Sequence, residues 1–217
     1  MSHNKLKHII FKLVLILMGL YVFLPFNFKN GITILAFAGA LIFIRESLKS
    51  VSIIDILVFL LIGIAPFFTQ LNSASLNELI RLSPLIIFPL FFSSFKYESH
   101  EKLKKEMILF NKIFFVSLNL FFIFFIYYFT SLGYKGVKFF FNFPEMTNSG
   151  IGSFSFHPIY LSILTCLSIV IGVELLNREK SIFKRTLLFL GICFLTFNTV
   201  CLSRKAFLFF ILSFFFY

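Results

Sequence analysis

The chain has 217 residues, of which 59% are hydrophobic and only 13% are charged, and its formal net charge is +11. Soluble globular proteins contain about 25% charged residues, so this composition excludes a soluble chain and indicates a polytopic membrane protein. The positive charge does not indicate nucleic-acid binding, because the 20 Lys and Arg residues are scattered through short connections and form no basic face with interleaved aromatic residues.

Apolar stretches that are long enough to cross a bilayer recur along nearly the whole chain. A hydrocarbon core of roughly 30 Å requires about 20 residues of α-helix. We therefore predict an all-α, polytopic membrane bundle, with seven full transmembrane helices plus a truncated eighth, in a single transmembrane domain over 1–217. In chain order, the predicted helices are 9–26, 31–44, 53–68, 76–95, 107–129, 158–176, 186–202 and 206–217. A tight turn at NFKNG, 27–31, separates the first two helices, and a longer outer loop occupies 130–157.

The basic residues in the connections predict the orientation of these helices. Connections on the cytoplasmic side of a membrane are enriched in Lys and Arg. With the N-terminus in the cytoplasm, every inner connection carries at least two basic residues, and the larger share of the 20 Lys and Arg falls inside. Even-numbered helices then run from outside to inside, so their N-terminal ends lie at the outer face.

A polar triplet opens the eighth predicted helix at this outer face. The first turn of a helix has unpaired N–H groups and partial positive charge, which favour a phosphate. Arg204 offers a planar fork of donors, Lys205 offers a point charge, and Ser203 offers a capping hydroxyl. The alternative is a plain turn whose two cations anchor to lipid headgroups, although adjacent cations are unexpected on the outer face.

Two further outer positions carry polar residues near a helix start. Pro158 suits the first position of the sixth helix, with His157 beside the cap and the Tyr160 hydroxyl within the next turn. The alternative is a simple capping or interfacial histidine. In the fourth helix, Arg81 either faces the bundle interior or pairs with Glu78 at i and i+3.

Motifs of other chemistries are absent from the sequence. There is no Walker-type loop, no HExxH motif and no nucleophile elbow. Glu145 is the only acidic residue of the long outer loop, so the paired carboxylates of a glycosidase are missing. We predict neither a metal nor a cofactor, and no catalytic residue is identified.

Three segments together resemble the O-antigen ligase and polymerase family of bacterial inner membranes: FHPIYLSIL at 156–164, the basic connection NREKSIFKR at 177–185, and CLSRKAF at 201–207. The resemblance implies a GT-C-like fold and a metal-independent, inverting glycosyltransferase at the outer face of the bacterial inner membrane. The implied donor is a glycan on undecaprenyl diphosphate, and the implied acceptor is lipid A-core or another lipid-linked glycan. Arg204 would then engage the diphosphate.

The chain departs from the family pattern in two respects. Lys205 stands where the family's turn carries glycine, and the family's long outer loop with a further arginine and a general-base histidine is missing from these 217 residues. We therefore expect the chain to be the N-terminal portion of such an enzyme, and to be inactive alone. A membrane transporter or flippase component is the alternative, and a non-catalytic membrane scaffold is the third hypothesis.

Overall fold

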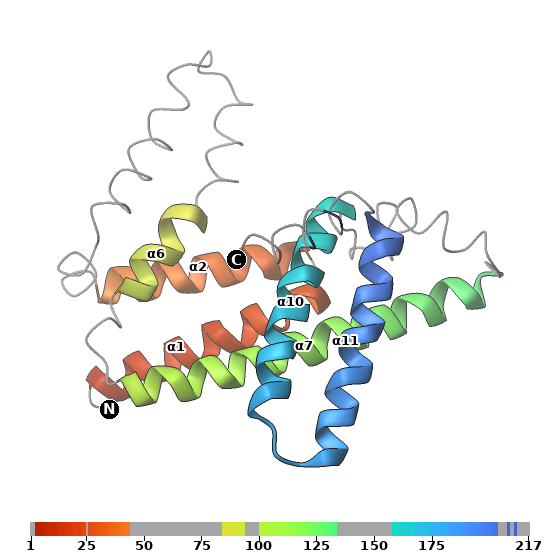
Figure 1. The fold of residues 1–217 in the computed structure, drawn as a ribbon. Coiled ribbons are helices and arrows are strands. Elements are labelled where there is room, and N and C mark those ends of the chain that lie inside the picture. Colours follow the sequence, from red (N-terminus) through yellow and green to blue (C-terminus); the bar gives the residue numbers. More distant parts are fainter. Residues whose placement is uncertain are drawn as a thin grey trace. The chain divides into compact units, whose positions relative to one another are not determined.

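The computed structural model describes residues 3–24, 26–43, 84–93, 100–133 and 158–203, together with 208 and 211 (Figure 1). Every regular element within these ranges is a helix, so the prediction of an all-α protein is confirmed for them. The predicted helix at 53–68, nearly all of 206–217 and most of the loop at 130–157 lie outside the described residues.

The described elements are six α-helices and one short 3₁₀ helix. Three α-helical stretches are long and apolar enough to cross a membrane, Leu103–Ser131, Leu161–Arg178 and Ile182–Leu202, and they support the assignment to a membrane. In chain order, the elements are α1 at His3–Gly19, the 3₁₀ helix η1 at Tyr21–Phe23, α2 at Phe26–Ile42, α6 at Pro84–Ser93, α7 at His100–Ser131, α10 at Pro158–Arg178 and α11 at Ile182–Leu202.

The break between the first two helices differs from the predicted one. Residues 27–31, for which we predicted a tight turn, are helical, because α2 begins at Phe26. The chain instead leaves the helical conformation at Leu24, which is extended with φ −86° and ψ 130°. Leu24 precedes Pro25 in the sequence, and a residue before proline is pushed out of the helical region by the proline ring. The proline therefore sets this boundary.

Two helices begin earlier than their apolar runs. Helix α1 begins at His3 and α7 at His100, whereas the apolar stretches predicted starts at 9 and 107. The added segments contain good helix formers: HNKLKH has two Lys residues, and HEKLKKE has three Lys and two Glu residues. Each of these two helices therefore begins several residues before its apolar stretch.

The structure divides into two compact units. The first comprises residues 1–15 and 27–106, and the second comprises residues 16–26 and 107–217. In the first unit, the ring centroids of Phe11 in α1 and Phe91 in α6 are 6.3 Å apart. The Lys7 ammonium lies 5.8 Å from the ring centroid of Phe43, which follows α2. The start of α1 is therefore close to the end of α2, as expected for antiparallel neighbours.

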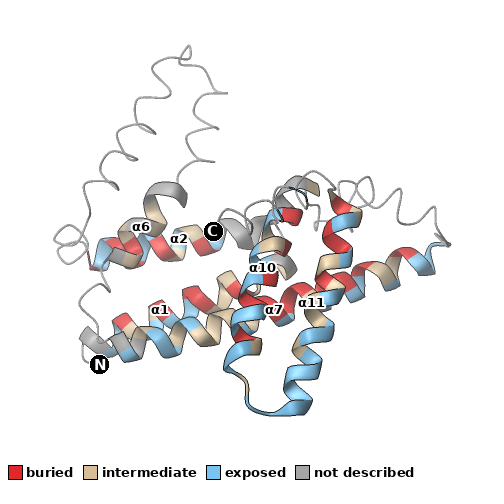
Figure 2. Ribbon diagram, in the orientation of Figure 1, coloured by how far each residue is buried: buried red, intermediate tan, exposed pale blue. Residues whose placement is uncertain are grey.

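Helix α7 is the centre of the second unit, where a phenylalanine-rich cluster forms the core (Figure 2). One face of α7 receives the end of the first helix: the Ser117 hydroxyl donates to the Gly19 carbonyl at 2.6 Å, and Phe121 packs edge-on against Phe23. The same helix also carries Phe115, which is 4% exposed and contacts both α10 and α11. Helix α7 thus joins separate parts of the sequence.

Helices α10 and α11 form an antiparallel hairpin joined by residues 179–181 (Figure 1). Each helix has 21 residues and is about 30 Å long at 1.5 Å per residue, so each helix of the hairpin matches the thickness of a bilayer core. Gly172 in α10 and Gly191 in α11 both lie against the ring of Phe115. Because glycine has no side chain, the hairpin packs closely on α7, as small residues allow in membrane helices.

Replacing Gly172 with alanine tests this close packing. A Cβ at Gly172 would lie 2.5 Å from Phe115 Cε2 and 2.8 Å from Ile192 Cγ1, so the buried ring must move. We expect Gly172→Ala to lower the free energy of unfolding by about 1–3 kcal/mol, even though alanine is the better helix former. Reversible unfolding in mixed detergent micelles, followed by circular dichroism, measures the change.

Gly31→Ala is the matched control for the same chemical change. Gly31 is an exposed helical position in α2, and a Cβ there meets nothing within 4 Å. Only the higher helix propensity of alanine then acts, and we expect the free energy of unfolding to rise by up to about 1 kcal/mol. Equal stability changes in the two variants would contradict the packing of Gly172 against Phe115.

Candidate functional site

The α10–α11 hairpin brings two of the segments singled out in the sequence to the same end. Helix α10 begins at Pro158 and α11 ends at Leu202. Because the helices are antiparallel and equal in length, the start of α10 and the end of α11 lie together, at the end opposite the short connection (Figure 1). We call this the open end of the hairpin: the first turn of α10 and the last turn of α11 with Ser203.

Local chemistry explains where the two helices stop at the open end. Pro158 is the first residue of α10, at the position that the sequence predicts, where its fixed φ suits the helix and its missing N–H costs nothing. Ser203 leaves the helical conformation with φ −157° and ψ 103°, and its N–H donates to the Thr199 carbonyl at 3.0 Å. The polar break in the CLSRK segment therefore coincides with the end of α11.

The structure describes two of the six predicted site residues. Ser203 is half-buried directly after α11, and Tyr160 belongs to the first turn of α10, so the hairpin brings the two backbone positions to one end. The other predicted site residues lie outside the described ranges: Arg81, His157, Arg204 and Lys205.

Buried polar side chains lie just inside the open end, and none of them is among the predicted site residues. Ser162, Thr165 and Thr199 are 0% exposed, and Asn198 is 1% exposed; together they form what we call the polar seam. Ser162 in α10 and Asn198 in α11 are equally far in sequence from Lys180 in the connection, so they lie at about the same level. The available signal was polar residues inside apolar, membrane-length helices, which usually face the bundle interior.

One atom of the polar seam lacks a hydrogen-bond partner. The hydroxyls of Thr165 and Thr199 donate to carbonyls of their own helices, at 2.6 and 2.8 Å. The Asn198 Nδ2 group likewise donates to the Phe194 carbonyl at 2.7 Å, but the buried Oδ1 of Asn198 accepts no hydrogen bond. An unpaired buried carbonyl costs about 1–3 kcal/mol. The polar seam therefore offers an unused acceptor below the open end.

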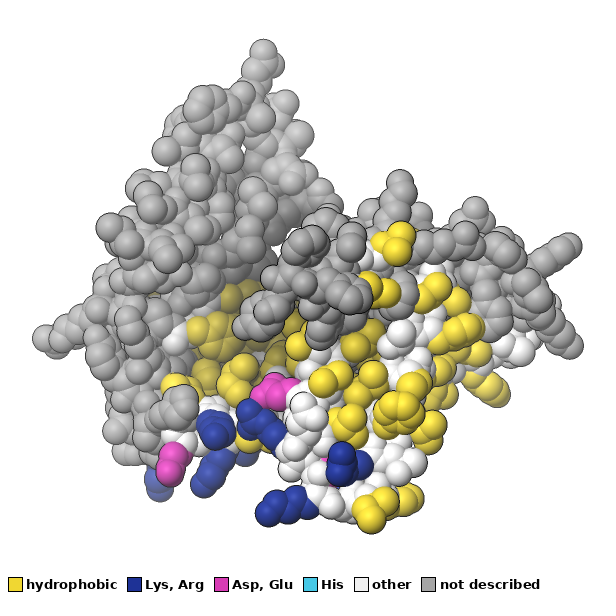
Figure 3. Space-filling view, viewed as in Figure 1, with side chains coloured by type: hydrophobic (Ala, Val, Ile, Leu, Met, Phe, Trp, Pro, Cys, Tyr) yellow, Lys and Arg dark blue, Asp and Glu magenta, His cyan; other side chains and the backbone are white. Residues whose placement is uncertain are grey.

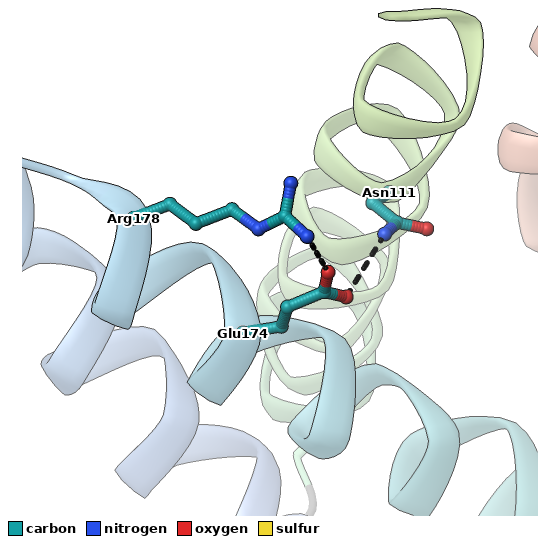
Figure 4. Close-up of polar contacts among 3 residues, drawn as sticks. All are labelled: Asn111, Glu174 and Arg178. Carbon is teal, nitrogen blue, oxygen red and sulfur yellow. Dashed lines mark hydrogen bonds and ion pairs between the residues drawn. The ribbon is translucent and has the colours of Figure 1, made fainter. Parts of the chain in front are cut away.

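The opposite end of the hairpin holds a charged cluster with α7 (Figure 4). Arg178 donates to Glu174 Oε1 at 2.5 Å, and the Asn111 amide donates to Glu174 Oε2 at 3.4 Å. Within the connection, backbone hydrogen bonding from Ser181, with a smaller contribution from Lys184, lowers the pKa of Glu179. Both oxygens of Glu174 are thus engaged by groups from two helices.

The described charged residues of the second unit all lie toward this end. Among the described residues, 113–131 of α7, 158–173 of α10 and 186–202 of α11 contain no Asp, Glu, Lys or Arg. The described residues also contain no group of three or more His, Cys, Asp or Glu residues that could hold a metal ion. Within the described ranges, the three spans therefore have one charged end and one end whose polar groups are uncharged.

The chain matches no protein-family model and is not significantly similar to any curated protein or solved structure. The resemblance to the O-antigen ligase and polymerase family therefore depends on the three sequence segments alone.

Asn198→Leu tests the unpaired acceptor of the polar seam. Leucine has a similar size and removes an unsatisfied polar atom, so we expect the free energy of unfolding to rise by about 1 kcal/mol. Thr199→Val is the neighbouring control: its hydroxyl is satisfied by the Leu195 carbonyl, and we expect a loss of about 0.5–1 kcal/mol. Chemical unfolding in micelles measures both. A loss of stability in Asn198→Leu would show that Oδ1 has a partner in the folded protein.

Proposed function

We propose that this chain belongs to a membrane glycosyltransferase of the O-antigen ligase or polymerase type and contributes its lipid-diphosphate binding site. The observation that carries the proposal is the geometry of the open end, where the start of α10 and the end of α11 lie together. His157 directly precedes Pro158 in the sequence, and Arg204 and Lys205 directly follow Ser203. Two segments of the family resemblance, FHPIYLSIL and CLSRKAF, therefore adjoin helix ends that lie together.

The proposed reaction transfers a glycan from undecaprenyl diphosphate to lipid A-core or to another lipid-linked glycan. The diphosphate leaving group gains negative charge as its bond to the sugar breaks, so cations fixed beside it stabilise the transition state. In this role Arg204 gives two parallel hydrogen bonds, and Lys205 supplies a second positive charge. The Ser203 hydroxyl, His157, Tyr160 and Arg81 are the candidate polar groups around them.

The proposal places the open end at the outer face of a bacterial inner membrane, within a GT-C-like bundle of seven full transmembrane helices whose N-terminus is cytoplasmic. The distribution of charge supports this orientation, because the described charges of the second unit all lie at the opposite end of the spans. Clusters of Lys and Arg mark the cytoplasmic side of a membrane protein. Lipid-linked glycans are then met at the end of the hairpin that carries the polar seam.

A transporter or flippase component is less well supported by the described helices. Such proteins bind their substrates near the middle of the membrane, at helices broken by Pro or Gly and with ionisable residues nearby. Helices α7, α10 and α11 run unbroken, and their described charged residues lie toward one end. We therefore retain the glycosyltransferase as the proposed function.

Arg204→Ala, introduced into the complete enzyme of which this chain is proposed to be the N-terminal portion, tests the diphosphate role in cells whose own copy of the gene is deleted. A charge-assisted hydrogen bond contributes about 1.5–3 kcal/mol, so we expect glycan transfer to fall by about tenfold or more. Arg204→Lys keeps the charge but loses the fork, and we expect intermediate transfer. Electrophoresis of the acceptor-linked glycan measures transfer, and the undecaprenyl-diphosphate-linked glycan should accumulate.

Lys104→Ala is the matched control, because it removes one positive charge from an exposed position of α7. We expect this variant to transfer glycan at the normal rate. Immunoblots of the membrane fraction compare the amounts of each variant. Normal transfer by Arg204→Ala at equal protein levels would overturn the assigned role.

A further inference from the structure

The connection between α10 and α11 combines exposed cations with exposed apolar side chains. Lys180, Lys184 and Arg185 are exposed, and between them in the sequence stand Ile182 and Phe183, which are 83% and 75% exposed. Figure 3 shows Lys and Arg side chains beside hydrophobic ones at this lower end of the hairpin. Such a mixture is typical of a segment that lies at the membrane interface.

The two carboxylates nearby neutralise these cations only in part, since Lys184 interacts electrostatically with Glu179. Glu174 is engaged by Arg178 and by the Asn111 amide. Glu179 Oε1 accepts hydrogen bonds from the backbone N–H groups of Lys180 and Ser181, at 3.2 and 3.3 Å. The three exposed cations form no ion pair with any residue of the described ranges. The turn therefore has excess positive charge.

An apolar track continues from the turn along one face of α11. Phe183, Leu187 and Leu190 follow one another at spacings of four and three residues, which places them on the same side of the helix. Their side chains are 75%, 62% and 59% exposed. Lys184 adjoins the start of this track. A ligand that fits both parts has an anionic head and a long apolar chain.

We propose that the α10–α11 turn binds an anionic phospholipid, with Lys180 and Lys184 contacting the headgroup phosphate, Arg185 adding positive charge at the turn, and an acyl chain lying along Phe183, Leu187 and Leu190. An acidic protein segment matches the cations but leaves the apolar track uncovered within a helix of membrane-spanning length. A zwitterionic lipid covers the track but adds no net charge to balance the cations. The inference is independent of glycan transfer.

The absence of tryptophan from the chain gives a direct test. Phe183→Trp introduces a single fluorophore at the turn, and Phe197→Trp introduces one on the same face near the other end of α11, where Phe197 is 50% exposed. The full chain is placed in nanodiscs that contain phosphatidylcholine and phosphatidylglycerol, with either one or the other lipid brominated. Bromine quenches tryptophan fluorescence only at close range, so quenching reports which lipid is adjacent.

We expect brominated phosphatidylglycerol to quench Phe183→Trp more strongly than brominated phosphatidylcholine at equal mole fraction. A basic residue at an anionic surface contributes about 1 kcal/mol, which corresponds to roughly fivefold enrichment of the anionic lipid. In Phe197→Trp the two brominated lipids should quench equally. Equal quenching by both lipids at position 183 would overturn the proposal.

Charge removal separates this site from general attraction to an anionic bilayer. In the Phe183→Trp chain, replacing Lys180, Lys184 and Arg185 with glutamine should abolish the lipid preference. Replacing Lys104 and Lys105, which are exposed in α7, should leave the preference unchanged. Circular dichroism checks the helix content of both variants. A preference that persists in the glutamine variant of the turn, with its helix content intact, would equally refute the proposal.

Discussion

The contact of the Phe115 ring with two glycines holds the second unit together. In lipid, helices gain no hydrophobic free energy from associating, so close van der Waals packing must stabilise their contact. Gly172 and Gly191 each leave room for the same ring, which fixes α10 and α11 against α7 at one level. This contact sets the position of the charged cluster, since Asn111 lies one turn before Phe115 and Glu174 lies just beyond Gly172. It sets the opposite end as well, because α10 begins 14 residues before Gly172 and α11 ends 11 residues after Gly191.

The hairpin therefore has two chemically different ends. At one end, Glu174 and Arg178 lie close enough to the end of the span for their charges to remain solvated. At the other end, the side chains of the polar seam are uncharged and buried, and three of the four donate to carbonyls of their own helix. Bonds of this kind satisfy the donors without involving a second helix. The Asn198 Oδ1 atom, in contrast, is buried and accepts no hydrogen bond. It is therefore the atom of the polar seam that would gain most from a donor outside its helix.

Sequence patterns predicted some features and missed others for physical reasons. The all-α class followed from apolar length, and the start of α10 followed from the fixed φ of Pro158. The break near Pro25 was misplaced at 27–31 because Asn and Gly suggested a turn, whereas the restriction that proline imposes on Leu24 had the stronger effect. The placement of Ser162 and Asn198 at the same level depends on the length of the connection and on helix register. No local pattern contains that information, and Arg81, His157, Arg204 and Lys205 stay predictions from sequence alone.

Cations that suit a phosphate occur on both sides of the hairpin, and the two sets differ in what explains them. In the proposed orientation, Lys180, Lys184 and Arg185 follow the general enrichment of basic residues on the cytoplasmic side, and a lipid headgroup is a sufficient partner for them. Arg204 and Lys205 follow the opposite end of α11, where that enrichment gives no reason for adjacent cations. An anion bound there would offset the cost of placing charge beside an end whose described residues are uncharged. The membrane-bound diphosphate of the proposed donor is such an anion, and so the proposed orientation of the hairpin, rather than its net charge, is the argument for glycan transfer from a lipid carrier.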